Sequence, residues 1–160
     1  MNKTFKTTFL YAFLKHVLLL IIISIIILLK LDISLLGAKY LHINLIPYIH
    51  VFSLILFFIY AYYVFYTYLT TYKITEEQLS ITYGVFSINT DYLELYRIKD
   101  IEIKSPFLLR LIGLYNLKLY TSDLSHSIII LEGINIKNLP LEIRNQVEKL
   151  RKIKGVYEID

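Results

Sequence analysis

Two long apolar runs dominate the first half of the chain. The first, residues 17–29, contains a single hydroxyl side chain, Ser24, and no charge. The second covers about residues 45–69, and no charged side chain occurs between Lys39 and Lys73. Each Leu or Ile near the centre of a helix favours insertion by about 0.5 kcal/mol, so the first run alone favours a bilayer by roughly 6 kcal/mol. This pattern predicts a membrane-embedded half.

The lengths of these runs define the expected spans. A helix needs about 20 residues to cross roughly 30 Å of hydrocarbon, so the first run must extend back to Phe9. The N-terminal stretch 1–15 reads as an amphipathic helix that provides this extension. Tyrosines crowd the second half of the second run, as expected where a helix leaves the bilayer. We therefore predict transmembrane helices at about residues 9–29 and 45–69, joined by a connector over residues 30–44.

A cleaved signal peptide is the alternative for the first run, because Lys3 and Lys6 precede an apolar core. Lys30 and Asp32 separate that core from the small residues at 37–38, and a second apolar run follows. A permanent anchor explains both features better.

Charge is distributed unevenly along the chain. Residues 1–69 carry five lysines against one acid, Asp32, whereas residues 70–160 carry twelve basic and twelve acidic side chains. The balanced polar half argues against a nucleic-acid-binding surface. The N-terminal flank is more basic than the connector, so the positive-inside rule places both termini in the cytoplasm. The chain has no cysteine, which excludes disulfides and thiolate metal sites.

The hydrophobic period changes after residue 72. Apolar and polar residues alternate at 79–83, 101–104 and 117–121, and an apolar stretch follows at 128–131, so these segments read as strands. A helical turn is expected between Pro106 and Gly113. A final helix is expected after Asn138, its capping residue, with Pro140 in its first turn. The second half thus reads as a small antiparallel β-sandwich or barrel with a C-terminal helix.

The end of this last helix is basic. Lys149, Arg151, Lys152 and Lys154 are the candidate contact residues for lipid or a partner. Cations at a helix C-terminus suit the helix dipole, so capping electrostatics is the first explanation of these residues. Contact with anionic headgroups is the functional alternative for a domain tethered close to a bilayer.

Three motifs in order carry a family resemblance. Residues 72–79 (YKITEEQL) lead to Gly84, residues 95–101 (LYRIKDI) contain Arg97 and Ile98, and residues 108–114 (LLRLIGL) contain Arg110 and Gly113. This order resembles the bacterial pleckstrin-homology-like (PH) membrane proteins, in their short two-helix type. The resemblance covers residues 70–135 best, and it implies a multi-pass protein of the bacterial inner membrane. It divides the chain into a membrane region, 1–70, and a cytoplasmic PH-like domain, 71–160.

The resemblance implies a bent antiparallel sheet of seven strands, closed at one end by the C-terminal helix. Within it, Gly84 turns the chain, Ile98 and Ile101 are buried, and residues 108, 111 and 114 plug the open end of the barrel. Arg97 and Arg110 are expected to pair with carboxylates such as Glu94, Asp100 or Glu102. PH domains that bind phosphoinositides use basic residues around the first hairpin, and here Lys73 is followed by Glu76 and Glu77, so no specific inositol-phosphate site is expected.

Three functional classes differ in the sequence features that they require. No nucleophile, metal or phosphate-binding motif is present, so we predict no enzyme, no metal and no cofactor. A non-catalytic membrane-anchored interaction module fits best, because PH-like scaffolds can bind peptides by strand addition. Its expected partners are membrane lipid and a second membrane protein, such as a longer relative with several PH-like domains, or a second copy of itself. An accessory subunit of an export or channel assembly, or a domain that binds anionic lipid, is the alternative.

Overall fold

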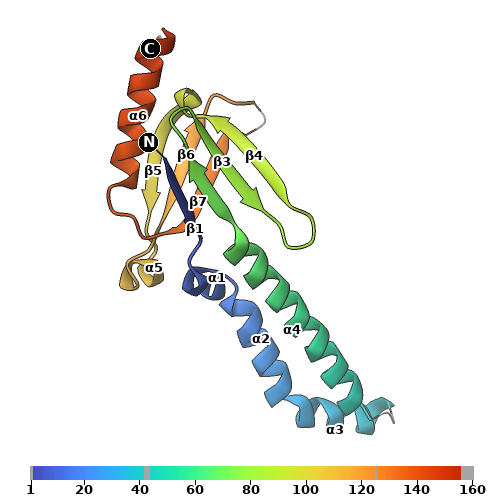
Figure 1. Ribbon diagram of the computed structural model, residues 1–160. Coiled ribbons are helices and arrows are strands. Elements are labelled where there is room, and N and C mark those ends of the chain that lie inside the picture. The colour runs from blue at the N-terminus through green and yellow to red at the C-terminus, as the bar shows by residue number, and fades with distance from the viewer. Residues whose placement is uncertain (1, 42–43, 125, 156–160) are drawn as a thin grey trace. The chain divides into compact units, whose positions relative to one another are not determined.

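The computed structural model describes residues 2–41, 44–124 and 126–155 (Figure 1). The chain forms two compact units. One combines Met1–Tyr11 with Tyr66–Asp160, and the other is Ala12–Phe65. We call the first the sheet unit and the second the helical unit.

The sheet unit contains two antiparallel sheets. The first has the order β1-β2-β3-β4 and the second the order β5-β6-β7. A 3₁₀ turn, η1 (Leu95–Arg97), joins the two sheets, α5 (Phe107–Leu111) joins β5 to β6, and α6 (Leu139–Lys154) follows β7. The strands are β1 (Lys3–Lys6), β2 (Thr71–Ile74), β3 (Gln78–Tyr83), β4 (Asn89–Glu94), β5 (Ile98–Lys104), β6 (Tyr115–Thr121) and β7 (Ile128–Ile134). The predicted α+β class, with antiparallel sheets and a C-terminal helix, is confirmed.

One apolar core lies between the sheets and α6. Alternate residues of the strands point into it, and Leu117, Leu119 and Leu131 are fully buried. The buried stripe of α6 consists of Leu139, Ile143, Val147 and Leu150. The expectation that the last helix packs on the sheet is therefore confirmed. Asn138 precedes α6 as predicted, but its side chain makes no capping hydrogen bond, and its backbone carbonyl accepts from Glu142 at 3.0 Å instead.

The N-terminal residues differ from the prediction. Residues 3–6 form β1 and pair with β2, so the expectation of a helix across residues 1–15 is wrong for this part. The segment alternates in burial, and the ring of Phe5 lies 5.4 Å from that of Tyr72. Pairing along a whole strand outweighs the weak helical pattern of so short a segment. As a result, the helical unit lies in sequence between two neighbouring strands of one sheet.

The helical unit is built on four helices, of which the first and the last also extend into the sheet unit. They are α1 (Phe9–Lys15), α2 (Val17–Leu28), α3 (Lys30–Leu41) and α4 (Ile46–Leu69). The axes of α1 and α2 differ by 56°, so the expected continuous helix over residues 9–29 is interrupted at His16. Most of the expected connector, residues 30–44, is helix α3; residues 42 and 43 lie outside the described residues.

Of the described helices, α4 is the one that is long and apolar enough by itself to cross a membrane. The bent pair α1 and α2 passes the same test only when taken together. Inside the helical unit, Ala12 and Ile23 pack against Tyr60 and Val64. Only 17% of the most apolar window of α4 is buried, whereas the core helix of a soluble protein is mostly buried.

Candidate interaction groove

The family-like motifs mostly have structural roles. Gly84 ends β3 with a φ of +122°, and Gly113 follows α5 with a φ of +70°. Ile98 is buried as expected, and Ile101 packs against the core. The residues expected to plug the open end of the barrel were 108, 111 and 114. Of these Leu114 is buried, whereas Leu108 and Leu111 are exposed and Leu109 is buried instead. In so short a helix only one side faces the sheet, and it is the side that carries Leu109.

Arg97 makes the carboxylate pairs that the sequence suggests. Its Nε donates to Oε2 of Glu94 at 3.0 Å, and its Nη1 lies 3.5 Å from Oδ2 of Asp123. A hydrogen bond from Tyr96, together with Arg97, lowers the pKa of Glu94. The other two expected acids have different partners: Asp100 accepts from the backbone and Glu102 from Tyr120. Arg97 thus fastens η1 to the loop after β6.

Arg110 has a different environment from the one expected. Its guanidinium lies 5.9 Å from the centre of the Phe107 ring, one turn earlier in α5. Among the described residues no carboxylate pairs with it. A cation over an aromatic face is a weak attraction at an exposed site.

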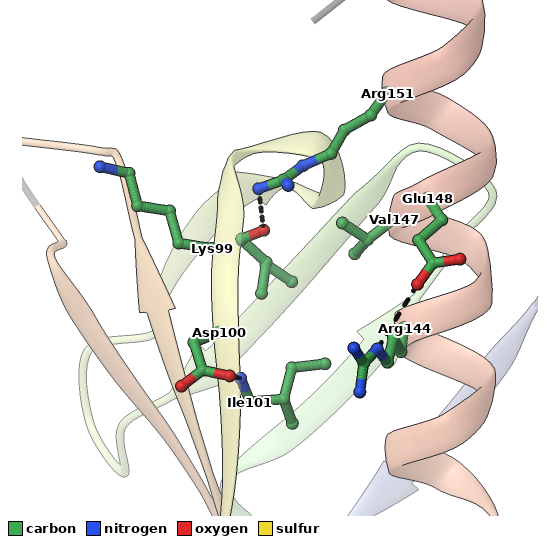
Figure 2. Close-up of a pocket in the computed structure, with 8 residues that line it drawn as sticks. Lys99, Asp100, Ile101, Arg144, Val147, Glu148 and Arg151 are labelled. Atoms are coloured by element: carbon green, nitrogen blue, oxygen red, sulfur yellow. Dashed lines mark hydrogen bonds and ion pairs between the residues drawn. The ribbon is translucent and has the colours of Figure 1, made fainter. Parts of the chain in front are cut away.

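A pocket of about 270 Å³ lies between β5 and α6. β5 is an edge strand, since the second sheet has the order β5-β6-β7. We call this site the β5–α6 groove (Figure 2). It is lined by Ile98, Lys99, Asp100 and Ile101 from β5 and by Arg144, Val147, Glu148 and Arg151 from α6.

Two side chains in the groove bond to backbone groups of β5. Figure 2 shows Arg151 reaching from α6 to the carbonyl oxygen of Ile98, to which its Nη2 donates at 2.7 Å. Its Nε also donates to the carbonyl oxygen of Tyr96 at 3.2 Å. Oδ1 of Asp100 accepts from the backbone N–H of Ile101 at 2.7 Å. These bonds satisfy polar groups at the start of an edge strand, which would otherwise be open for pairing.

The groove combines an apolar floor with charged walls. Val147 and Ile98 are buried, and Ile101 is half-buried beside them. Three cations and two carboxylates surround this floor, and Arg144 and Glu148 form an exposed pair at 3.4 Å. Exposed pairs of this kind contribute little to stability and reorganise easily. The groove can therefore bury an apolar side chain while its walls offer charges to polar neighbours.

A family model described as "Bacterial PH domain" matches residues 8–153. The chain belongs to this bacterial PH domain family. No curated protein and no solved structure matches it. PH domains are generally non-catalytic interaction modules, and among the described residues no group of three or more acidic or histidine side chains could hold a metal ion.

The pairing of β1 with β2 changes the interpretation of the first hairpin. The sequence pattern suggested that residues 71–83 form it, but the first two paired strands are β1 and β2. The connection between them is the helical region itself, rather than a short basic loop. The acidic residues Glu76 and Glu77 belong to the next turn, where Gln78 donates its backbone N–H to Thr75 Oγ1 at 3.1 Å.

The four basic residues singled out in the sequence separate into two pairs in the PH domain. Arg151 and Lys154 both contact η1, because the Nζ of Lys154 lies 4.5 Å from the centre of the Tyr96 ring. Lys149 and Lys152 are exposed on α6. Only Arg151 of the four lines the β5–α6 groove.

Sequence reasoning missed most of this groove. The sequence placed Lys99 in a family motif and Asp100 among the expected partners of Arg97 and Arg110, and it did not indicate Arg144 or Glu148 as site residues. Their spacing of four residues was a usable signal, since it places both on one face of the last helix. That this face borders the edge of β5 depends on tertiary packing.

Proposed function

We propose that this PH domain is a membrane-anchored interaction module that binds an extended segment of a partner membrane protein in the β5–α6 groove. The observation that supports it best is an edge strand lying beside a pocket with an apolar floor. An extended peptide can add to such an edge through main-chain hydrogen bonds, while a neighbouring pocket selects one of its side chains. A second copy of this chain is the other partner that such an edge admits.

The groove favours certain peptides. Ile98, Ile101 and Val147 would accept an apolar side chain of the incoming segment. Lys99, Arg144 and Arg151 outnumber the two carboxylates, so an acidic residue near that apolar side chain would be favoured over a basic one. Arg151 and Asp100 bond to backbone groups at the start of β5, so strand addition would use the later part of the strand, residues 102–104.

The connection between β1 and β2 supports a two-span anchor. The N–H of Thr7 donates to the carbonyl oxygen of Thr70 at 3.2 Å, so the segment between them leaves and returns to one point of the sheet unit. A segment that leaves and returns on one side of a bilayer crosses it an even number of times. If α4 is one crossing, residues 9–29 provide the other, through the bent pair α1 and α2.

This anchor predicts the sidedness of labelling. Because the chain contains no cysteine, a single introduced cysteine is the one thiol in the chain that a maleimide can label. A cysteine at exposed Ala38, in α3, should react with a membrane-impermeant maleimide in intact cells. A cysteine at exposed Asn145, in α6, should react only after the membrane is permeabilised. Equal labelling of both positions in intact cells would contradict a two-span anchor with a cytoplasmic PH domain.

Charge reversal tests the groove itself. The double variant Lys99→Glu/Arg144→Glu should reduce the partner that co-purifies in mild detergent roughly tenfold or more, because charges that face a bound segment then repel its acidic group. Native mass measurement of the purified complex would quantify this loss and distinguish a foreign partner from a second copy.

The matched control is Lys149→Glu/Lys152→Glu. It changes the net charge by the same amount on an exposed face of α6, outside the groove. The control should retain the partner. Loss of the partner only in the control would move the binding surface to that basic face, which is also where an anionic lipid would bind. A native mass of one chain for the unmodified protein would contradict the proposal.

A further inference from the structure

Two exposed apolar segments flank the point where the chain leaves the sheet unit. One is α5, where Phe107, Leu108 and Leu111 are 64%, 55% and 67% exposed. The other is the β3–β4 turn, residues 84–88, where Phe86 and Ile88 are 92% and 74% exposed. Figure 1 shows both segments at the end of the sheets where β2 begins.

Contacts within the sheet unit fix both segments beside that exit point. Tyr11, in α1, is buried against Leu109 and Leu114, which places α5 next to the outgoing chain. The ring of Tyr66, in the last turns of α4, lies 6.1 Å from that of Tyr83, which immediately precedes the β3–β4 turn. These contacts do not depend on how the helical unit is placed.

We propose that α5 and the β3–β4 turn insert into the interface of the bilayer and hold the PH domain against the membrane surface. This inference rests on the membrane anchor proposed above. Exposed apolar side chains beside the residues that lead into the proposed anchor would lie within reach of the bilayer surface. Amphipathic segments of this kind lie about 5–10 Å deep, between headgroups and acyl chains.

The charge of the two segments suits lipid. Neither residues 105–113 nor residues 84–90 contain a carboxylate, and Arg110 is the one charged side chain in either stretch. A cation beside an exposed aromatic ring can remain among the headgroups while the ring lies deeper. The cytoplasmic leaflet is anionic, so a carboxylate here would be repelled.

Single tryptophans can test this inference, because the chain has no Trp. We would reconstitute the full chain carrying Phe107→Trp or Phe86→Trp into vesicles with and without lipids brominated near the headgroup end of the acyl chain. Both variants should lose much of their emission in the brominated vesicles. Tyr92→Trp, at a 67% exposed site in β4, is the matched control and should not lose emission.

Phe58→Trp serves as the reference for the anchor and is measured with lipids brominated near the far end of the acyl chain, since Phe58 is an exposed residue at the middle of α4. If Phe58→Trp is quenched and both test variants behave like Tyr92→Trp, the insertion of these segments is refuted while the anchor stands. If Phe58→Trp is not quenched, the anchor fails and the insertion fails with it. Blue-shifted but unquenched emission from Phe107→Trp would mean that protein covers α5, which also overturns the proposal.

Discussion

Replacing Gly84 with alanine should destabilise the sheet unit by about 3 kcal/mol or more. Gly84 has a φ of +122°, a conformation that is nearly restricted to glycine and costs about 1–3 kcal/mol for other residues. A Cβ atom here would also lie 1.9 Å from the backbone carbonyl oxygen of Ser87, so the turn itself would have to move. Thermal unfolding in detergent, followed by circular dichroism, should show a midpoint lower by roughly 10 °C or more.

Gly113→Ala is the control for this prediction. Gly113 also has a positive φ, +70°, but a Cβ there would meet no atom within 4 Å. The left-handed conformation alone costs an alanine roughly 1–2 kcal/mol, so the midpoint should fall much less than in Gly84→Ala. Equal losses in the two variants would show that the overlap at Ser87 is relieved easily and that only the backbone conformation matters.

Truncating Ile143 to alanine should cost about 2–5 kcal/mol, because the side chain is fully buried between α6 and the sheets. Part of this loss is the transfer of apolar surface and part is the cavity that remains. Leu141→Ala, at a 61% exposed site on the same helix, should change stability by no more than about 0.5 kcal/mol. The same detergent unfolding measurement compares the two. Similar midpoints for both variants would contradict the packing of α6 described above.

The sequence predicted the long strands and the last helix well. Alternation at 79–83 and 117–121 is long enough to be recognised, and a buried stripe at 143, 147 and 150 matches a helical period. It missed β1, which has four residues and a partner far along the chain. It also missed the break at His16, because residues 9–15 and 17–28 are both apolar and helical. Composition alone does not distinguish one straight helix from two.

The candidate site was harder to predict than the fold. Arg151 was selected for its charge at a helix end, whereas its main bonds are to the backbone carbonyls of Tyr96 and Ile98. Every residue has a backbone carbonyl, so the sequence does not indicate which carbonyl an arginine will bind. Arg97 was predicted more successfully, since one of its partners, Glu94, is a near neighbour, although Asp123 was not foreseen. Local pairs can be inferred from spacing, and pairs that join distant elements need the fold.

The position of the helices between β1 and β2 also has a consequence for folding. β1 has no partner until β2 has been synthesised, across a loop of roughly 60 residues whose closure is entropically unfavourable. Packing of α2 against α4 would shorten that loop to the residues that join the helix contact to the strands, and each halving of its length recovers about 0.6 kcal/mol. Assembly of the helical pair would then precede completion of the first sheet. If the helical pair assembled slowly, β1 would remain unpaired and could form hydrogen bonds with the edge strand of another chain.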